Sequence, residues 1–72
     1  MNQNEQVLSY LMEHGSITPM DAIENFGIMR LGARIFDLKS SGVPIKTLQE
    51  TNKNRNGKQV RYARYVLEDN NA

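Results

Sequence analysis

Two short segments between Thr18 and Gly42, each ended by a glycine, constrain the fold more than any other part of this sequence. Thr18-Pro19 is a typical helix start, because a hydroxyl that can cap the helix is followed by proline at the first helical position. Gly27 ends that helix after about two turns. A second helix is expected to begin at residue 29 or 30 and to end at residue 40 or 41. The sequence therefore predicts two short helices joined by a tight turn.

The second of these helices carries two different faces. Leu31, Ile35 and Leu38 have the spacing of a stripe that is buried in a core. A polar stripe lies beside them and consists of Arg30, Arg34, Asp37 and Ser41. The helix is thus expected to pack on the protein with one side and to offer the other side to an anionic partner.

A further helix is expected before this pair, over residues 6–14, with Gly15 at its end. Its apolar stripe has helical spacing and consists of Val7, Leu8, Leu11 and Met12. The helix that begins after Thr18 is expected to bury Met20, Ile23 and Phe26. All three helices are therefore predicted to share one small core.

From Ile45 onward the apolar period changes to two. Two β-rich runs, residues 45–52 and 59–67, flank a loop in which Asn56-Gly57 is a strong hairpin signal. A turn centred there pairs Leu48 with Tyr65, and the face expected to pack on the helices then consists of Leu48, Ala63, Tyr65 and Leu67. The predicted class is α+β, with three helices followed by a two-stranded antiparallel hairpin.

The formal net charge of +1 hides a strong division along the chain. Residues 1–29 contain four acids and no lysine or arginine, whereas residues 30–67 contain all nine bases and two acids. A basic half of this kind is typical of a surface that binds an anion such as nucleic acid.

Length and composition exclude several classes of protein. A chain of 72 residues forms a single domain, predicted here over residues 1–72 with an ordered core of about 5–67 and a frayed tail, and it has little room for a catalytic cleft. With no cysteine and one histidine the sequence offers no zinc site, so we predict no metal, no cofactor and no enzymatic activity. The sequence has no apolar run that could cross a membrane and no secretory signal, so an intracellular protein is expected.

The segment from Gly27 to Lys39, together with Arg61-Tyr62-Ala63-Arg64-Tyr65, resembles the small helix-turn-helix proteins encoded by phages and prophages. The resemblance covers about residues 6–67, and three helices followed by a hairpin is the order of a winged helix-turn-helix domain. It implies binding of double-stranded DNA in the regulation of transcription, excision or replication. A phage-encoded protein of this kind acts in the cytoplasm or nucleoid of its host.

In such a fold the third helix enters the major groove and its first residues meet the base edges. The residues expected to do so are Met29, Arg30, Ala33 and Arg34, since a guanidinium can donate two hydrogen bonds to guanine. The residues of the hairpin, or wing, expected on the DNA backbone are Lys53, Arg55, Asn56, Lys58 and Arg61. Two alternatives stay open: Arg34 pairs with Asp37 or Glu24 on a solvated face, and the charged hairpin tip only prevents aggregation.

A second function from another class also fits the sequence. A protein-interaction module of phage origin would bind and inhibit a host protein through the acidic first two helices, which carry Glu5, Glu13, Asp21 and Glu24. A homodimer also suits a DNA reader of this size, with the first helix and Tyr10 as its interface. Gly32, inside the third helix, either allows close approach of a phosphate or a neighbouring helix, or is simply tolerated.

Overall fold

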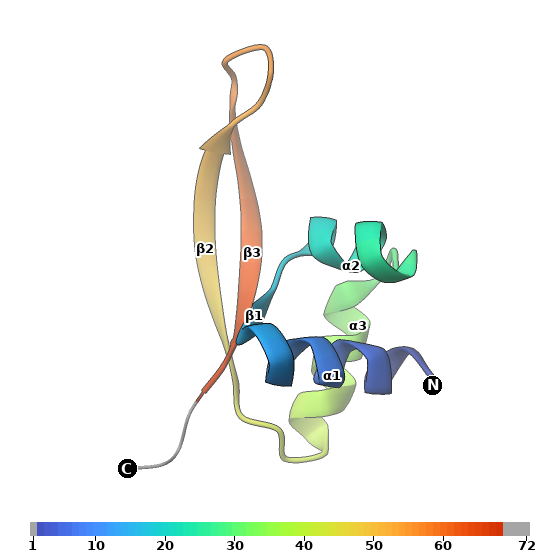
Figure 1. Cartoon of the computed structure of the whole chain (residues 1–72). Helices are drawn as coiled ribbons and strands as arrows, with labels where there is room; N and C mark the ends of the chain where they lie inside the picture. The colour runs from blue at the N-terminus through green and yellow to red at the C-terminus, as the bar shows by residue number, and fades with distance from the viewer. Residues whose placement is uncertain (1, 69–72) are drawn as a thin grey trace.

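The computed structural model describes residues 2–68. In this range the elements are α1 (Gln3–His14), β1 (Ser16–Ile17), α2 (Pro19–Phe26), α3 (Leu31–Ser40), β2 (Ile45–Lys53) and β3 (Gln59–Leu67). Figure 1 shows the hairpin of β2 and β3 rising beside the three helices. The predicted α+β class is confirmed, and β1 adds a short third strand to an antiparallel sheet of order β1-β3-β2. The predicted tail lies, apart from Glu68, outside the described residues.

Helix α1 begins earlier than predicted, at Gln3 rather than near Gln6. The backbone N–H of Glu5 donates to Asn2 Oδ1 at 2.8 Å, and the Asn2 N–H donates to Glu5 Oε1 at 3.5 Å. This reciprocal capping box satisfies two N–H groups that the first turn of a helix leaves without a partner. The polar opening of the chain is therefore part of the helix.

Helix α2 begins as predicted, with Thr18 as its N-cap. The Asp21 N–H donates to Thr18 Oγ1 at 3.2 Å, and the Thr18 N–H donates to Asp21 Oδ2 at 3.0 Å. Pro19 occupies the first turn, and Gly27 ends the helix with a φ of 67°. A side chain with a Cβ is disfavoured in that left-handed conformation, so glycine is the natural residue here.

The prediction for the buried face of α2 is correct for Phe26, which packs against the core, and wrong for Met20 and Ile23. Met20 and Ile23 are 59% and 40% exposed, and the fully buried residue of the helix is Ala22. In a helix of only eight residues, the stripe through Pro19, Ala22 and Phe26 is as regular as the one predicted. The two stripes share Phe26 and differ by a rotation of roughly 70°, and the small Ala22 side chain is the one that the core accommodates.

The core contains side chains from all three helices and from the strands. Leu31, Ile35 and Leu38 of α3 are buried, as predicted. On α1 the prediction holds for Val7 and Leu11, which are buried, and for Leu8, which packs partly buried against the core, whereas Met12 is 70% exposed. The complete buried set is Val7, Leu11, Ile17, Ala22, Ile28, Leu31, Ile35, Leu38 and Ile45.

Tyr10 is also placed differently from the prediction. Tyr10 is predicted to be exposed surface for a dimer, but its ring packs edge-on against Phe26 with ring centroids 5.9 Å apart. It lies partly buried against the core. Tyr10 therefore contributes to the packing of α1 on α2.

The register of the hairpin differs from the prediction by one residue. Tyr65 lies opposite Thr47, and Leu48 lies opposite Arg64. Because successive residues of a strand point to opposite faces, this shift buries Ile45 and leaves Leu48 exposed. For β3 the predicted inward face is correct, since Tyr65 and Leu67 pack against the core.

The wider loop at the hairpin tip explains this register. The strands end at Lys53 and Gln59, so the loop spans residues 54–58. Asn54 Oδ1 accepts hydrogen bonds from the N–H groups of Asn56 at 2.9 Å and Lys58 at 3.0 Å. The Asn54 side chain thus holds a loop longer than the two-residue turn that Asn56-Gly57 predicts.

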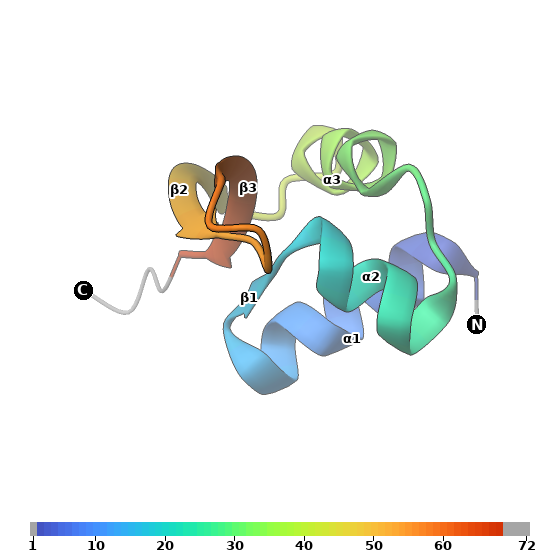
Figure 2. The same ribbon diagram turned by 90° about the horizontal axis from the view of Figure 1, so that it is seen from above.

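Figure 2 shows that α3 and the hairpin lie along one side of the molecule, whereas α1 and α2 lie along the other. A hydrogen bond of 3.4 Å from Lys39 Nζ to Thr47 Oγ1 connects α3 with β2. None of the helices within residues 2–68 has the length and apolar character needed to span a membrane.

Candidate nucleic-acid interface

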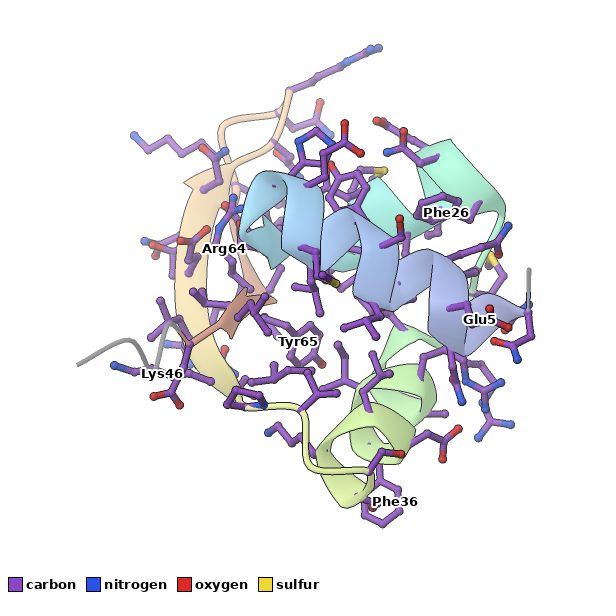
Figure 3. The ribbon with its side chains drawn as sticks, turned by 60° about the horizontal axis from the view of Figure 1, so that its bottom comes forward. Glu5, Phe26, Phe36, Lys46, Arg64 and Tyr65 are labelled. Atoms are coloured by element: carbon purple, nitrogen blue, oxygen red, sulfur yellow. The ribbon has the colours of Figure 1, made fainter. Side chains whose placement is uncertain are left out.

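The outward face of α3 lies opposite its buried stripe. At about 100° per residue, this outward face contains Ala33, Phe36 and Ser40, and Met29 extends it beyond the helix start. Met29 is 77% exposed and Phe36 is 70% exposed. Figure 3 shows Phe36 pointing away from the body of the protein, whereas Tyr65 points into it. The most exposed side of α3 is therefore mainly apolar.

Phe36 is absent from the residues that the sequence analysis selects. Phe36 is not a cation, and it follows Ile35 directly, so in the sequence it resembles one more core residue. The available signal is its position, since it lies well outside the arc of Leu31, Ile35 and Leu38 on a helical wheel.

Three of the predicted residues lie where α3 begins. Arg30 is the N-cap residue, is exposed and makes no side-chain capping hydrogen bond. Met29 precedes it, and Ala33 lies in the first turn with part of its surface exposed. These residues share one end of the outward face of α3.

Arg34 lies on the flank of α3 that faces α1. Its Nη2 is 3.3 Å from Asp37 Oδ2, and that oxygen also accepts a hydrogen bond of 3.4 Å from Asn4 Nδ2 of α1. Arg34 Nε is buried and finds no acceptor within residues 2–68. Of the alternatives left open by the sequence, the pair with Asp37 is the one formed, and such a pair contributes at most about 1 kcal/mol to stability.

The opposite flank of α3 faces the hairpin. A Cβ placed on Gly32 would have one heavy atom within 4 Å, Tyr65 Oη at 3.8 Å. Within the part of the chain described here, no neighbouring helix approaches Gly32. Close packing of another helix is therefore not the reason for a glycine at this position.

The predicted wing residues are all exposed, and they consist of Lys53, Arg55, Asn56, Lys58 and Arg61. Arg61 pairs with Thr51 and shares a face of β3 with Ala63 and Tyr65. Because Tyr65 lies next to Gly32, this is the face of the hairpin that looks over α3. Arg61 therefore projects on the same side of the molecule as α3.

Arg64 points to the other face of the hairpin. Its Nε donates to Glu50 Oε1 at 2.9 Å, and its Nη1 donates to Ser16 Oγ at 3.0 Å. The hydrogen bond from Arg64, followed by one from Tyr62, holds the pKa of Glu50 below its ordinary value of 4.5. The same bond to Glu50 raises the pKa of the Arg64 guanidinium. This arginine connects the three strands.

Both acids in the basic half of the chain form ion pairs with arginines. Asp37 is paired with Arg34, and Glu50 is paired with Arg64. Of the nine basic residues, seven are therefore left without an acidic partner among residues 2–68. They belong to α3 and its start, to the hairpin and to its loop, and they are Arg30, Lys39, Lys46, Lys53, Arg55, Lys58 and Arg61.

A fold of three helices with a β-hairpin wing beside the third helix defines a winged helix-turn-helix. The family model described as "Winged helix-turn-helix domain" matches residues 2–70 of this chain. The chain belongs to this family, which confirms the resemblance to winged helix-turn-helix domains. Domains of this family are typically DNA-binding modules rather than enzymes. A comparison with curated proteins returned no match.

Proposed function

We propose that this protein binds double-stranded DNA, with α3 in the major groove and the hairpin on the flanking backbone. The observation that carries the proposal is the group of bases without acidic partners, among the described residues, at α3, at the hairpin tip and on the hairpin face that looks over α3. They are Arg30, Lys39, Lys53, Arg55, Lys58 and Arg61. Phosphates attract such a surface, and each neutralised phosphate releases counterions.

The dimensions of α3 support this orientation. Its ten residues give a length of about 15 Å at 1.5 Å per residue. The major groove, about 12 Å wide, admits a helix that leads with its N-terminal end. Arg30 and Ala33 lie at that end, and Arg61 on the hairpin reaches toward the backbone beside it.

Arg34 receives a supporting role in this proposal. It is bound to Asp37, which in turn bonds Asn4, so it ties α3 to α1. The base contacts of α3 then come from the outward face and from Arg30.

We further propose that the protein is a small regulator of the phage or prophage type, acting in transcription, excision or replication. Its place of action would be the cytoplasm or nucleoid of the host cell. A single copy covers few base pairs, so a homodimer on two half-sites would give a longer recognition site. These roles rest on the resemblance of the sequence and not on the geometry.

The decisive experiment measures binding to a duplex of random sequence as a function of salt. Arg61→Ala is compared with Lys46→Ala, because each variant removes one positive charge from the hairpin. Lys46 lies opposite Val66, the residue after Tyr65 on β3. Successive residues of a strand point to opposite faces, so Lys46 lies on the face of the hairpin turned away from α3. Figure 3 shows Lys46 at the outer edge of β2.

We expect the native protein to bind less tightly as salt rises. Arg61→Ala should reduce the slope of log affinity against log salt by about 0.9, the value for one lost phosphate contact. Lys46→Ala should leave the slope unchanged. Equal slopes for all three proteins would refute the proposed orientation, and no binding at low salt would refute DNA binding itself.

One observation favours a second candidate, the protein-interaction module. On α1 a shallow hollow is lined by Leu8, Ser9 and Met12 between two acids, Glu5 and Glu13. An apolar side chain between carboxylates suits a basic segment of another protein. This function uses α1 and not α3. If Met12→Ala abolished binding of a partner protein and Arg61→Ala left that binding unchanged, the result would favour the protein-interaction module.

A further inference from the structure

We propose that α3 reads thymine methyl groups, so that the DNA it prefers is rich in A·T pairs where α3 lies in the groove. The inference rests on the proposed function, because it names the DNA for the same surface. It follows from the chemistry of the side chains that α3 leaves exposed.

The outward face of α3 has little capacity for hydrogen bonds to bases. Ala33 and Phe36 have no polar side-chain atoms, and Phe36 is 70% exposed. The one hydroxyl of this face belongs to Ser40, the last residue of α3. Arg34, the guanidinium nearest the middle of the helix, is engaged by Asp37 on the flank that faces α1. The middle of the helix therefore offers apolar surface to its partner.

One base edge in the major groove matches such a surface. The C5 methyl of thymine is the apolar group that the groove displays, and alanine and phenylalanine are residues that contact it. Both kinds of base pair also present acceptors and a donor in the major groove, so the thymine methyl is the feature that a side chain without polar atoms can distinguish. An apolar helix face therefore discriminates in favour of thymine.

The surroundings of Phe36 favour DNA over an apolar protein surface as the occupant. Arg30 lies at the start of α3, and Lys39 lies beside Thr47 at the junction with the hairpin. Arg61 projects from the hairpin on the same side. An apolar strip bordered by cations matches a groove whose floor carries methyl groups and whose edges carry phosphates.

The test compares a short alternating A·T duplex with the same duplex containing uracil in place of every thymine. This exchange removes only the methyl groups and keeps the charge, the pairing and the polar atoms of both grooves. We expect the native protein to bind the thymine duplex more tightly, on the order of four-fold for each methyl group that Phe36 or Ala33 covers.

Two variants make the test specific. Phe36→Ala should bind both duplexes with nearly equal affinity. Met12→Ala is the matched control, because Met12 is also 70% exposed but lies on α1, and it should keep the thymine preference. Thermal unfolding checks that both variants fold, which is expected since neither side chain is buried.

Equal affinity of the native protein for the two duplexes would overturn the inference. So would a Phe36→Ala variant that keeps the full thymine preference. In either case, salt-dependent binding to the uracil duplex would leave the proposed DNA binding intact. No binding to either duplex at low salt would refute the proposed function, and this inference with it.

Discussion

Replacing Gly32 with alanine should stabilise this protein. Gly32 lies in the first turn of α3 and is not in a left-handed conformation, so alanine fits its backbone. The added Cβ would lie 3.8 Å from Tyr65 Oη, an ordinary van der Waals distance. The substitution therefore introduces no clash and removes the backbone freedom that glycine gives the unfolded chain.

The expected gain is roughly 0.5–1 kcal/mol, the difference between glycine and alanine in a helix. For a domain of this size, that corresponds to a rise in Tm of roughly 2–8 °C. Gly27→Ala provides the matched control, since it adds the same methyl group at a φ of 67°. In that left-handed conformation a Cβ costs roughly 1 kcal/mol or more, so the control should lose stability.

The assay is thermal and urea unfolding followed by circular dichroism at low concentration, for the native protein and both variants. A lower stability of Gly32→Ala would refute the reasoning, because it would mean that Tyr65 cannot accept the methyl group. DNA affinity measured on the same samples separates the two explanations that remain for Gly32. Reduced affinity in a more stable variant indicates close approach of the DNA backbone, and unchanged affinity indicates a tolerated glycine.

Three further predictions concern stability. Thr18→Ala removes the side chain that caps α2 and should cost about 1 kcal/mol in urea unfolding, so unchanged stability would show that this capping box is dispensable. Leu11→Ala leaves a cavity at a fully buried position and should cost about 2–5 kcal/mol, a loss visible as a much lower Tm, and a small change would mean that the core collapses around it. Because the hydrogen bond from Arg64 lowers the pKa of Glu50 in the folded state, its contribution is present above pH 4.5 and is lost as the pH falls through the folded pKa. Glu50→Gln should therefore show a shallower loss of Tm on the acid side, and an identical pH profile would contradict this origin.

Much of the candidate interface follows from the sequence alone. The exposed cations of the hairpin follow from composition and period, and the buried stripe Leu31, Ile35 and Leu38 follows from spacing. For Arg34 the sequence leaves a base contact and a pair with an acid both open. The structure has the pair with Asp37, whose carboxylate also accepts a hydrogen bond from Asn4, 33 residues earlier in the chain. Phe36 is missed because it follows a core residue directly, although its position on the helical wheel, outside the arc of Leu31, Ile35 and Leu38, indicates an exposed side chain.

What the sequence by itself determines about this protein is its local structure. The cap at Thr18, the helix end at Gly27 and the alternation from Ile45 onward depend on hydrogen bonds and sterics within a few residues. Only the tertiary structure decides the rotation of α2 and the direction of Arg64, which bonds Ser16 at a separation of 48 residues. These features depend on which surfaces meet in the folded core, and several local patterns are equally regular until that packing selects one.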